Sequence, residues 1–316
     1  MRPRPHGIAA VLLAVGLGAA GCAPAGGTAA DPAQPAPFGN VVAGDPATLP
    51  ALHRAYEQDT AACMLGRGYT YHPEPLSTQD SKPPRNPYGL LTATEAGADG
   101  YGLTSGALAA PPADPNQARS TDSGWRTALL GTAAHQVTVQ VPGGQAFFYN
   151  SDACLTTAED QLYGPDYQRL HNTFQVLTNQ VLTAVQQDPR YLAAQRDWAA
   201  CMGRAGVAVK ELADAPALVG DRLGQAGQDP AAVRAVGLDE LRTARTDAGC
   251  QRSSALAAAV AAAQPGAERA TLGTHAADLD RLRALTGAAV ARATTGNAPA
   301  AGRVATAERS TTGSDD

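Results

Sequence analysis

The chain has 316 residues, with 24 lysines and arginines against 29 aspartates and glutamates, and a formal net charge of −5. This balance leaves no basic surface for the phosphates of nucleic acid, and no basic run that would attract the chain to anionic lipid. We therefore expect no nucleic-acid partner.

The N-terminus has the pattern of an export signal. Arg2 and Arg4 precede an uncharged apolar run from Gly7 to Gly21. At about fifteen residues, this run is short for a membrane-spanning helix, which needs about twenty. We predict that residues 1–21 are a secretory signal peptide.

The signal ends in the residues of a lipidation site. Ala19-Ala20-Gly21-Cys22 resembles the lipobox of bacterial lipoproteins, in which the cysteine receives a diacylglycerol and becomes the new N-terminus. Lipoboxes usually carry leucine where Ala19 stands, so an ordinary signal peptide with an incidental cysteine is the alternative. We expect Cys22 to carry acyl chains such as palmitate and to anchor the chain on the outer face of the cytoplasmic membrane.

The residues around the folded part have the composition of unfolded segments. Both flanks are rich in small residues and contain few large apolar ones, so they bury too little surface to fold. Residues 22–48 are predicted to be the lipidated cysteine with a flexible tether. Residues 294–316 are predicted to be a disordered tail.

Residues 49–187 are predicted to form the first of two unequal helical halves. A helix from Pro50 to Leu65 carries Cys63 and ends at Gly66 or Gly68. A Pro- and Gly-rich insertion follows it. The elements expected next are a short helix at 125–130, alternating residues at 137–141 and 147–149 that allow one small β-hairpin, and a helix at 166–187.

Residues 188–293 are predicted to form the second half. Asp188-Pro189 and Asp229-Pro230 each place a capping residue before a proline that suits the first helical turn. The second of these helices should end where Pro265-Gly266 turns the chain into a last helix at 267–293. The expected fold class is therefore mainly α, with a long C-terminal helical hairpin.

Four cysteines lie beyond the lipidation site, and an even number in an exported chain favours two disulfides. The sequence Ala-Ala-Cys-Met occurs twice, at 61–64 and 199–202, so the two halves repeat weakly. We predict that each repeated cysteine pairs within its own half, and a bond between the two repeats is the main alternative. The predicted pairs are Cys63 with Cys154 and Cys201 with Cys250; the alternative is Cys63 with Cys201.

Several motifs together resemble a known group of proteins. They are Ala-Cys-Met-x-x-x-Gly, Asn86-Pro87-Tyr88-Gly89, Gly100-Tyr101-Gly102, Asp152-Ala153-Cys154 and Trp198-x-x-Cys-Met. This pattern, over most of residues 49–256, resembles an uncharacterised group of secreted proteins and lipoproteins of actinobacteria. The resemblance implies export and transfers no activity or catalytic residue.

The loop after the first helix is the candidate ligand-binding site. Tyr69, Tyr71, His72 and Glu74 lie close together among prolines, and such a cluster could bind sugar or peptide or transfer protons. The alternative, which we favour, is that the tyrosines pack over the Cys63 helix and leave the histidine in solvent.

Other patterns that carry chemistry are absent from the sequence. There is no Cys-x-x-Cys pair for zinc or thiol exchange, no Gly-x-Ser-x-Gly, and no phosphate-binding glycine loop after a strand. We therefore predict no metal site, no cofactor and no catalytic residue. Met64 and Met202 are interpreted as core side chains rather than copper ligands.

Glu240 and Asp247 are seven residues apart on one helix face, so a paired-carboxylate site is conceivable. We favour a solvated face, with Arg242 and Arg245 as ion-pair partners.

These patterns predict a lipid-anchored extracytoplasmic lipoprotein that acts in the cell envelope by binding or as a structural component. Its partners would be the membrane, through the anchor, and an envelope polymer or a membrane protein. One alternative is a cell-wall-directed hydrolase that uses the His72 loop. A second alternative is a ligand sensor for a membrane partner. An enzyme is the less favoured class.

Overall fold

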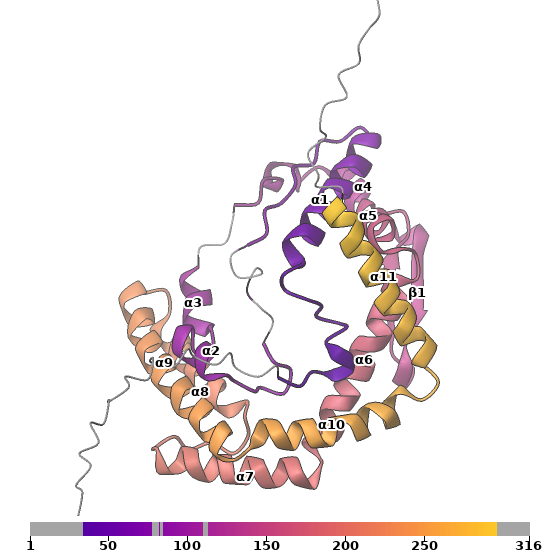
Figure 1. The fold of residues 1–316 in the computed structure, drawn as a ribbon. Helices are drawn as coiled ribbons and strands as arrows, with labels where there is room; N and C mark the ends of the chain where they lie inside the picture. The colour runs from indigo at the N-terminus through magenta and orange to yellow at the C-terminus, as the bar shows by residue number, and fades with distance from the viewer. Residues whose placement is uncertain (1–33, 78–81, 83–84, 110–112, 296–316) are drawn as a thin grey trace, which may run out of the picture. The chain divides into compact units, whose positions relative to one another are not determined.

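The fold is mainly helical, as the sequence predicts. The computed structural model describes residues 34–77, 82, 85–109 and 113–295. This part of the chain contains eleven α-helices and a two-stranded antiparallel sheet (Figure 1). The predicted signal peptide, Cys22 and the predicted tail beyond residue 295 lie outside the described residues.

The helices and strands follow one another along the chain in this order. They are α1 (Leu49–Gly66), α2 (Ala93–Ala98), α3 (Leu103–Leu108), α4 (Ser123–Leu130), β1 (Gln136–Gln140), β2 (Ala146–Asn150), α5 (Cys154–Tyr163), α6 (Tyr167–Gln186), α7 (Pro189–Arg204), α8 (Asp214–Ala226), α9 (Pro230–Ser253), α10 (Leu256–Leu272) and α11 (Ala276–Thr295).

The expected β-hairpin is present. β1 and β2 pair antiparallel, with Gln136 opposite Asn150. Gly143 and Gly144, between the strands, both have positive φ, a conformation that glycine adopts without steric cost. The alternation of β-branched and polar residues in β1 therefore predicts the strand, and the glycine pair predicts the reversal.

The two copies of Ala-Ala-Cys-Met end their helices in the same way. In α1 the residue after Gly68 donates its N–H to the carbonyl of Met64 at 2.9 Å, and Gly68 has φ of +85°. In α7 the residue after Gly206 donates to the carbonyl of Met202 at 2.9 Å, and Gly206 has φ of +84°. This bond pattern is a Schellman cap, which requires a residue with positive φ, and this explains why a glycine follows each motif.

Each of these helices is joined by a disulfide to a later helix. Cys63 of α1 is bonded to Cys154 at the start of α5, with 5.5 Å between the Cα atoms. Cys201 of α7 is bonded to Cys250 of α9, with 5.6 Å between the Cα atoms. The predicted pairing is confirmed. Both methionines that follow the repeated cysteines are fully buried in hydrophobic clusters, as expected of core side chains.

The predicted C-terminal hairpin is wrong. Its turn was expected at Pro265-Gly266, but the break after α9 comes at Ala255, which has φ of +53°, and α10 runs through Pro265 to Leu272. α10 packs mainly on α6 and α7, whereas α11 packs on α1, α5 and α6. The two last helices therefore do not form a hairpin with each other.

Contacts from distant parts of the chain explain why Pro265 does not end its helix. Gln264 donates to the carbonyl of Ala36 at 2.9 Å and to the carboxylate of Glu268 at 2.7 Å. Glu268 also accepts the N–H of Phe38 at 2.7 Å, from 230 residues away in the sequence. These bonds hold the turns on both sides of the proline, against a local cost of about 3 kcal/mol.

The segment before α1 packs on the helices, which corrects the tether prediction for residues 34–48. Phe38, the only aromatic residue of the expected tether, is 4% exposed and meets the ring of Phe174 edge-on at 5.5 Å. Val41 and Val42 pack against the same core cluster. The composition of the segment is that of a linker, but three apolar side chains are enough to attach it.

The two predicted halves share their packing. α11, from the second half, packs on α1 and α5 of the first half through a cluster that includes Leu52, Leu162 and Ala289. In the opposite direction, α2 and α3 from the first half pack on α9 (Figure 1). The position 187/188 therefore does not divide the core, and the Pro- and Gly-rich insertion is attached to the second half.

Candidate functional site

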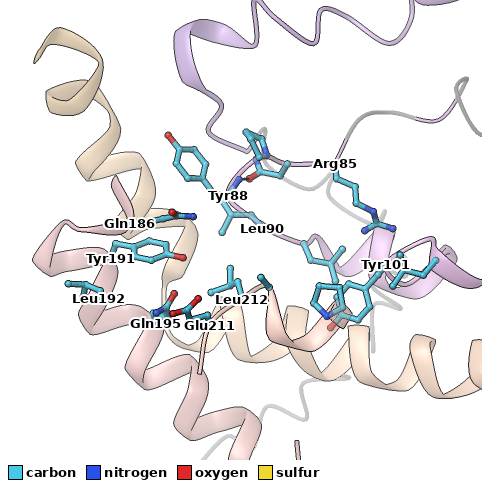
Figure 2. Close-up of a pocket in the computed structure, with 17 residues that line it drawn as sticks. Arg85, Tyr88, Leu90, Tyr101, Gln186, Tyr191, Leu192, Gln195, Glu211 and Leu212 are labelled. Atoms are coloured by element: carbon cyan, nitrogen blue, oxygen red, sulfur yellow. Dashed lines mark hydrogen bonds between the residues drawn. The ribbon is translucent and has the colours of Figure 1, made fainter. Parts of the chain in front are cut away.

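A cavity of about 480 Å³ is formed by four segments of the chain. They are the loop at 85–91, residues 101 and 103, the start of α7 with Gln186 at the end of α6, and residues 211–216 at the start of α8 (Figure 2). Pockets that hold small molecules in proteins have volumes of about 300–1,000 Å³. The cavity is therefore large enough for a small ligand.

The walls of the cavity are mostly apolar and aromatic. Tyr88 and Leu90 come from the loop, Tyr191 from α7 and Leu212 from the segment before α8, and each is at most 6% exposed. Tyr88 is fixed because its hydroxyl donates a hydrogen bond to Oε1 of Gln264 at 3.1 Å. Burial raises the pKa of this hydroxyl, so it stays protonated. These side chains provide contact area for an apolar ligand body.

Asp247, on α9, fixes the wall that carries Tyr101. Its carboxylate accepts hydrogen bonds from the Tyr101 hydroxyl at 2.8 Å, from Nε1 of Trp198 at 2.8 Å and from Nε2 of Gln251 at 2.9 Å. Asp247 is 1% exposed. Burial raises the pKa of its carboxyl, and the three donors act in the opposite direction.

Two further side chains of α9 bind the backbone of the same insertion. Gln251 accepts the N–H of Leu91 at 2.9 Å and donates to the carbonyl of Gly89 at 3.1 Å. Glu240 accepts the N–H groups of Leu103 and Thr104, both at 2.9 Å, at the start of α3. One face of α9 therefore holds the insertion at three points, and this makes the cavity wall a fixed structure.

The insertion approaches α9 closely because glycines stand at the contacts. Gly100 has φ of +60°, and a side-chain carbon there would lie 2.8 Å from Cγ of Glu240. A side-chain carbon at Gly237, on α9, would lie 2.9 Å from Cγ2 of Thr104. Larger residues at either position would separate the insertion from the helix.

The expectation that Glu240 and Asp247 form a solvated, salt-bridged face is wrong. Both carboxylates are buried, at 2% and 1% exposure, and neither forms an ion pair within the described residues. Arg242 instead pairs with Asp239, and Arg245 donates to the carbonyl of Gly97. The carboxylates accept bonds from tyrosine, tryptophan and backbone donors that come from sequence-distant segments.

The predicted ligand-binding residues do not line the cavity. Tyr71 is buried and donates its hydroxyl to Glu57 at 2.9 Å, and the N–H of Glu74 donates to the same carboxylate oxygen at 2.7 Å. His72 is held through its backbone, because its N–H and carbonyl both bond to the side chain of Asn116 at 2.8 Å. Hydrogen bonds therefore hold this loop against α1 and against Asn116.

The remaining side chains of this loop behave as the favoured structural interpretation predicts. Tyr69 and Tyr71 join a small cluster with Met64 and Trp125, in which the rings of Tyr71 and Trp125 stack at 6.1 Å. His72 itself is exposed. Burial raises the pKa of the Glu74 carboxyl, and repulsion from Glu57 adds to this shift.

The cavity was not predicted from the sequence. Tyr88 and Tyr101 stand in the Asn-Pro-Tyr-Gly and Gly-Tyr-Gly motifs, and both line it. Those motifs were the available signal, because they place aromatic side chains beside glycines in a loop. From the sequence, Tyr191 is expected only to lie on the apolar face of its helix, and no neighbouring residue indicates that its side chain lines a cavity.

Within the described residues, no group of three or more His, Cys, Asp or Glu side chains is arranged to hold a metal ion. The same part of the chain contains no helix with the length and apolar character required to span a bilayer.

Comparisons with known protein families, with curated proteins and with solved structures found no match to this chain. The chemistry of the cavity is therefore argued from its own residues.

Proposed function

We propose that this chain is a lipid-anchored extracytoplasmic lipoprotein whose folded part binds a small molecule in the cavity beside α7. The observation that carries the proposal is a cavity with apolar walls, one of which is held by three buried side chains of α9. A fixed apolar site with a few polar groups is typical of small-molecule binding.

The export part of the proposal is supported by the residues at Ala19 to Cys22 and by the two disulfides, which form and persist in oxidising compartments. Fractionation of cells that express the wild type and Cys22→Ser tests it. We expect the wild type in the membrane fraction and the variant in the soluble extracytoplasmic fraction. Wild-type protein in the cytosol with reduced cysteines would contradict it.

The binding part is tested by closing the cavity with a tryptophan. Ala213 lines the cavity and is exposed, whereas Ala217, one turn further along α8, is exposed and does not line it. A metabolite library is screened by thermal shift against the wild type, Ala213→Trp and Ala217→Trp. We expect ligands that stabilise the wild type and Ala217→Trp but not Ala213→Trp. Ligands that stabilise all three proteins equally, or none of them, would contradict a binding cavity.

The alternatives give different outcomes in related assays. A ligand sensor for a membrane partner would use the same cavity and would require that partner for its output. A cell-wall-directed hydrolase would use the His72 loop, so release of cell-wall fragments would be lost in His72→Ala and retained in Ala213→Trp. The fastened backbone of that loop is equally consistent with a purely structural role.

A further inference from the structure

Tyr191 has a polar group that the protein itself leaves without a partner. The residue is 2% exposed, and its hydroxyl makes no hydrogen bond within the described residues. Its ring extends from α7 into the space beside Leu212 (Figure 2). The hydroxyl is not one of the fully buried polar atoms that lack a partner, so it is accessible from the cavity, where a ligand atom can bond to it.

Two polar side chains lie at the same end of the cavity. Gln195 is one turn along α7 from Tyr191, and Glu211 comes from the segment before α8; Figure 2 shows the two close together below the Tyr191 ring. Neither side chain bonds to another group in the described chain. This end therefore offers a carboxylate, an amide and a hydroxyl, which suits a positively charged donor such as an ammonium group.

The opposite end of the cavity carries a positive charge. Figure 2 places Arg85 beside Tyr101, on the far side of Leu90 from Glu211. The nearby carboxylate of Asp99 is already paired with Lys82 at 2.9 Å, and Arg85 forms no ion pair within the described residues. The positive charge of Arg85 also acts on Asp99, but its exposed guanidinium forms no ion pair there and can bind a carboxylate through two parallel hydrogen bonds.

From these observations we infer that the ligand is a zwitterion, a short peptide with free ends, whose ammonium group binds at Glu211 and Tyr191 and whose carboxylate binds at Arg85. The apolar wall between the two ends, formed by Leu90 and Leu212, would contact its side chains. This inference rests on the proposed binding function, because it names the class of ligand for the same cavity.

Isothermal titration of the purified chain with the tripeptide Ala-Leu-Ala tests the inference. We compare the free peptide with its N-acetylated and its C-amidated forms. Each block removes one charge-assisted contact, so we expect each to weaken binding by about tenfold to a hundredfold. Equal binding of the free and blocked peptides would overturn the inference.

Variants assign each end of the peptide. In Glu211→Gln, N-acetylation should no longer matter, whereas C-amidation should still weaken binding. In Arg85→Gln, C-amidation should no longer weaken binding, whereas N-acetylation should still weaken it. Asp221→Asn and Arg234→Gln are matched controls, because both residues are exposed, lie outside the cavity and form no hydrogen bond or ion pair through their side chains in the described chain. Loss of peptide binding in the controls as well would overturn the assignment.

The cavity-closing variants separate this inference from the proposed function. If a screened compound binds the wild type and not Ala213→Trp, while Ala-Leu-Ala does not bind, the binding function stands and the peptide inference fails. A neutral disaccharide that binds with no need for Arg85 or Glu211 leads to the same conclusion. If no compound responds to Ala213→Trp, both fail.

Discussion

At the scale of single residues, two buried tyrosines beside the same cavity are in opposite situations. Tyr101 donates its hydroxyl to the buried carboxylate of Asp247 at 2.8 Å, whereas the hydroxyl of Tyr191 has no partner in the described chain. Burial raises the pKa of Tyr191 to about 12, and the charge of Glu211 adds to the shift. Both hydroxyls are therefore neutral at physiological pH, but only that of Tyr101 is hydrogen-bonded within the described chain.

This difference makes a matched pair of substitutions informative. Tyr101→Phe should lower the free energy of unfolding by about 1.5–3 kcal/mol, because it removes one donor from a buried charged acceptor. Tyr191→Phe should change it by less than about 0.5 kcal/mol, since no protein bond is lost. Urea denaturation of both variants measures the two values. Equal destabilisation would mean that the Tyr191 hydroxyl has a structural partner.

At the scale of elements, local signals predicted the helices whose ends are set by their own residues. Asp188 and Asp229 cap α7 and α9 through bonds to N–H groups two residues on, at 2.9 and 3.0 Å, and each precedes a proline. Each of these capping signals consists of neighbouring residues, so it can be recognised without knowing the rest of the fold. The helical repeat with its glycine caps was predictable for the same reason.

The elements that were not predicted from the sequence depend on partners elsewhere in the chain. α10 passes through Pro265 because bonds from residues 36 and 38 hold its flanks, and α3 begins where Glu240 accepts its first N–H groups. The candidate site was missed for the same physical reason. One wall comes from residues 85–103 and the other from residues 186–216, about one hundred residues further along the chain, and no local pattern shows which apolar side chain will face the opening.

The start of α7 also gives a prediction about pH. Arg190 holds the pKa of Asp188 down, from 3.8 to about 2, through its side chain and its backbone N–H. The folded state therefore favours the charged carboxylate, so its contribution to stability is present above about pH 3.8 and is lost as the pH falls towards 2. Asp188→Asn keeps the capping oxygen and removes the titration.

Urea denaturation from pH 2 to pH 6 measures this contribution as the difference in unfolding free energy between wild type and Asp188→Asn. We expect the difference to be constant above about pH 4.5 and to shrink towards pH 2. Arg190→Gln removes the main cause of the shift, and in that background the pH dependence of the difference should be smaller. A difference that does not change with pH would contradict the assignment.

At the scale of the whole molecule, the two disulfides belong to different hydrophobic clusters of the described chain. Cys63–Cys154 joins α1 to α5, and neither of these helices lines the cavity. Cys201–Cys250 joins α7 to α9, and Cys250 is the neighbour in sequence of Gln251, which holds Gly89 and Leu91. The second bond therefore couples the oxidation state of the chain to the wall of the cavity.

Removing each disulfide should separate stability from binding. With sequence separations of 91 and 49 between the bonded cysteines, loop entropy gives each bond about 4–5 kcal/mol of stabilisation. Cys63→Ala/Cys154→Ala should lower the melting temperature and leave ligand binding intact well below it. Cys201→Ala/Cys250→Ala should lower the melting temperature by a similar amount and weaken binding at the same low temperature, because α7 lines one wall and α9 holds the insertion that forms the other. Calorimetric titration of both double variants at 10 °C, with a ligand that Ala213→Trp does not bind, measures this. Equal affinities would show that the α9 side chains hold the cavity without help from the disulfide.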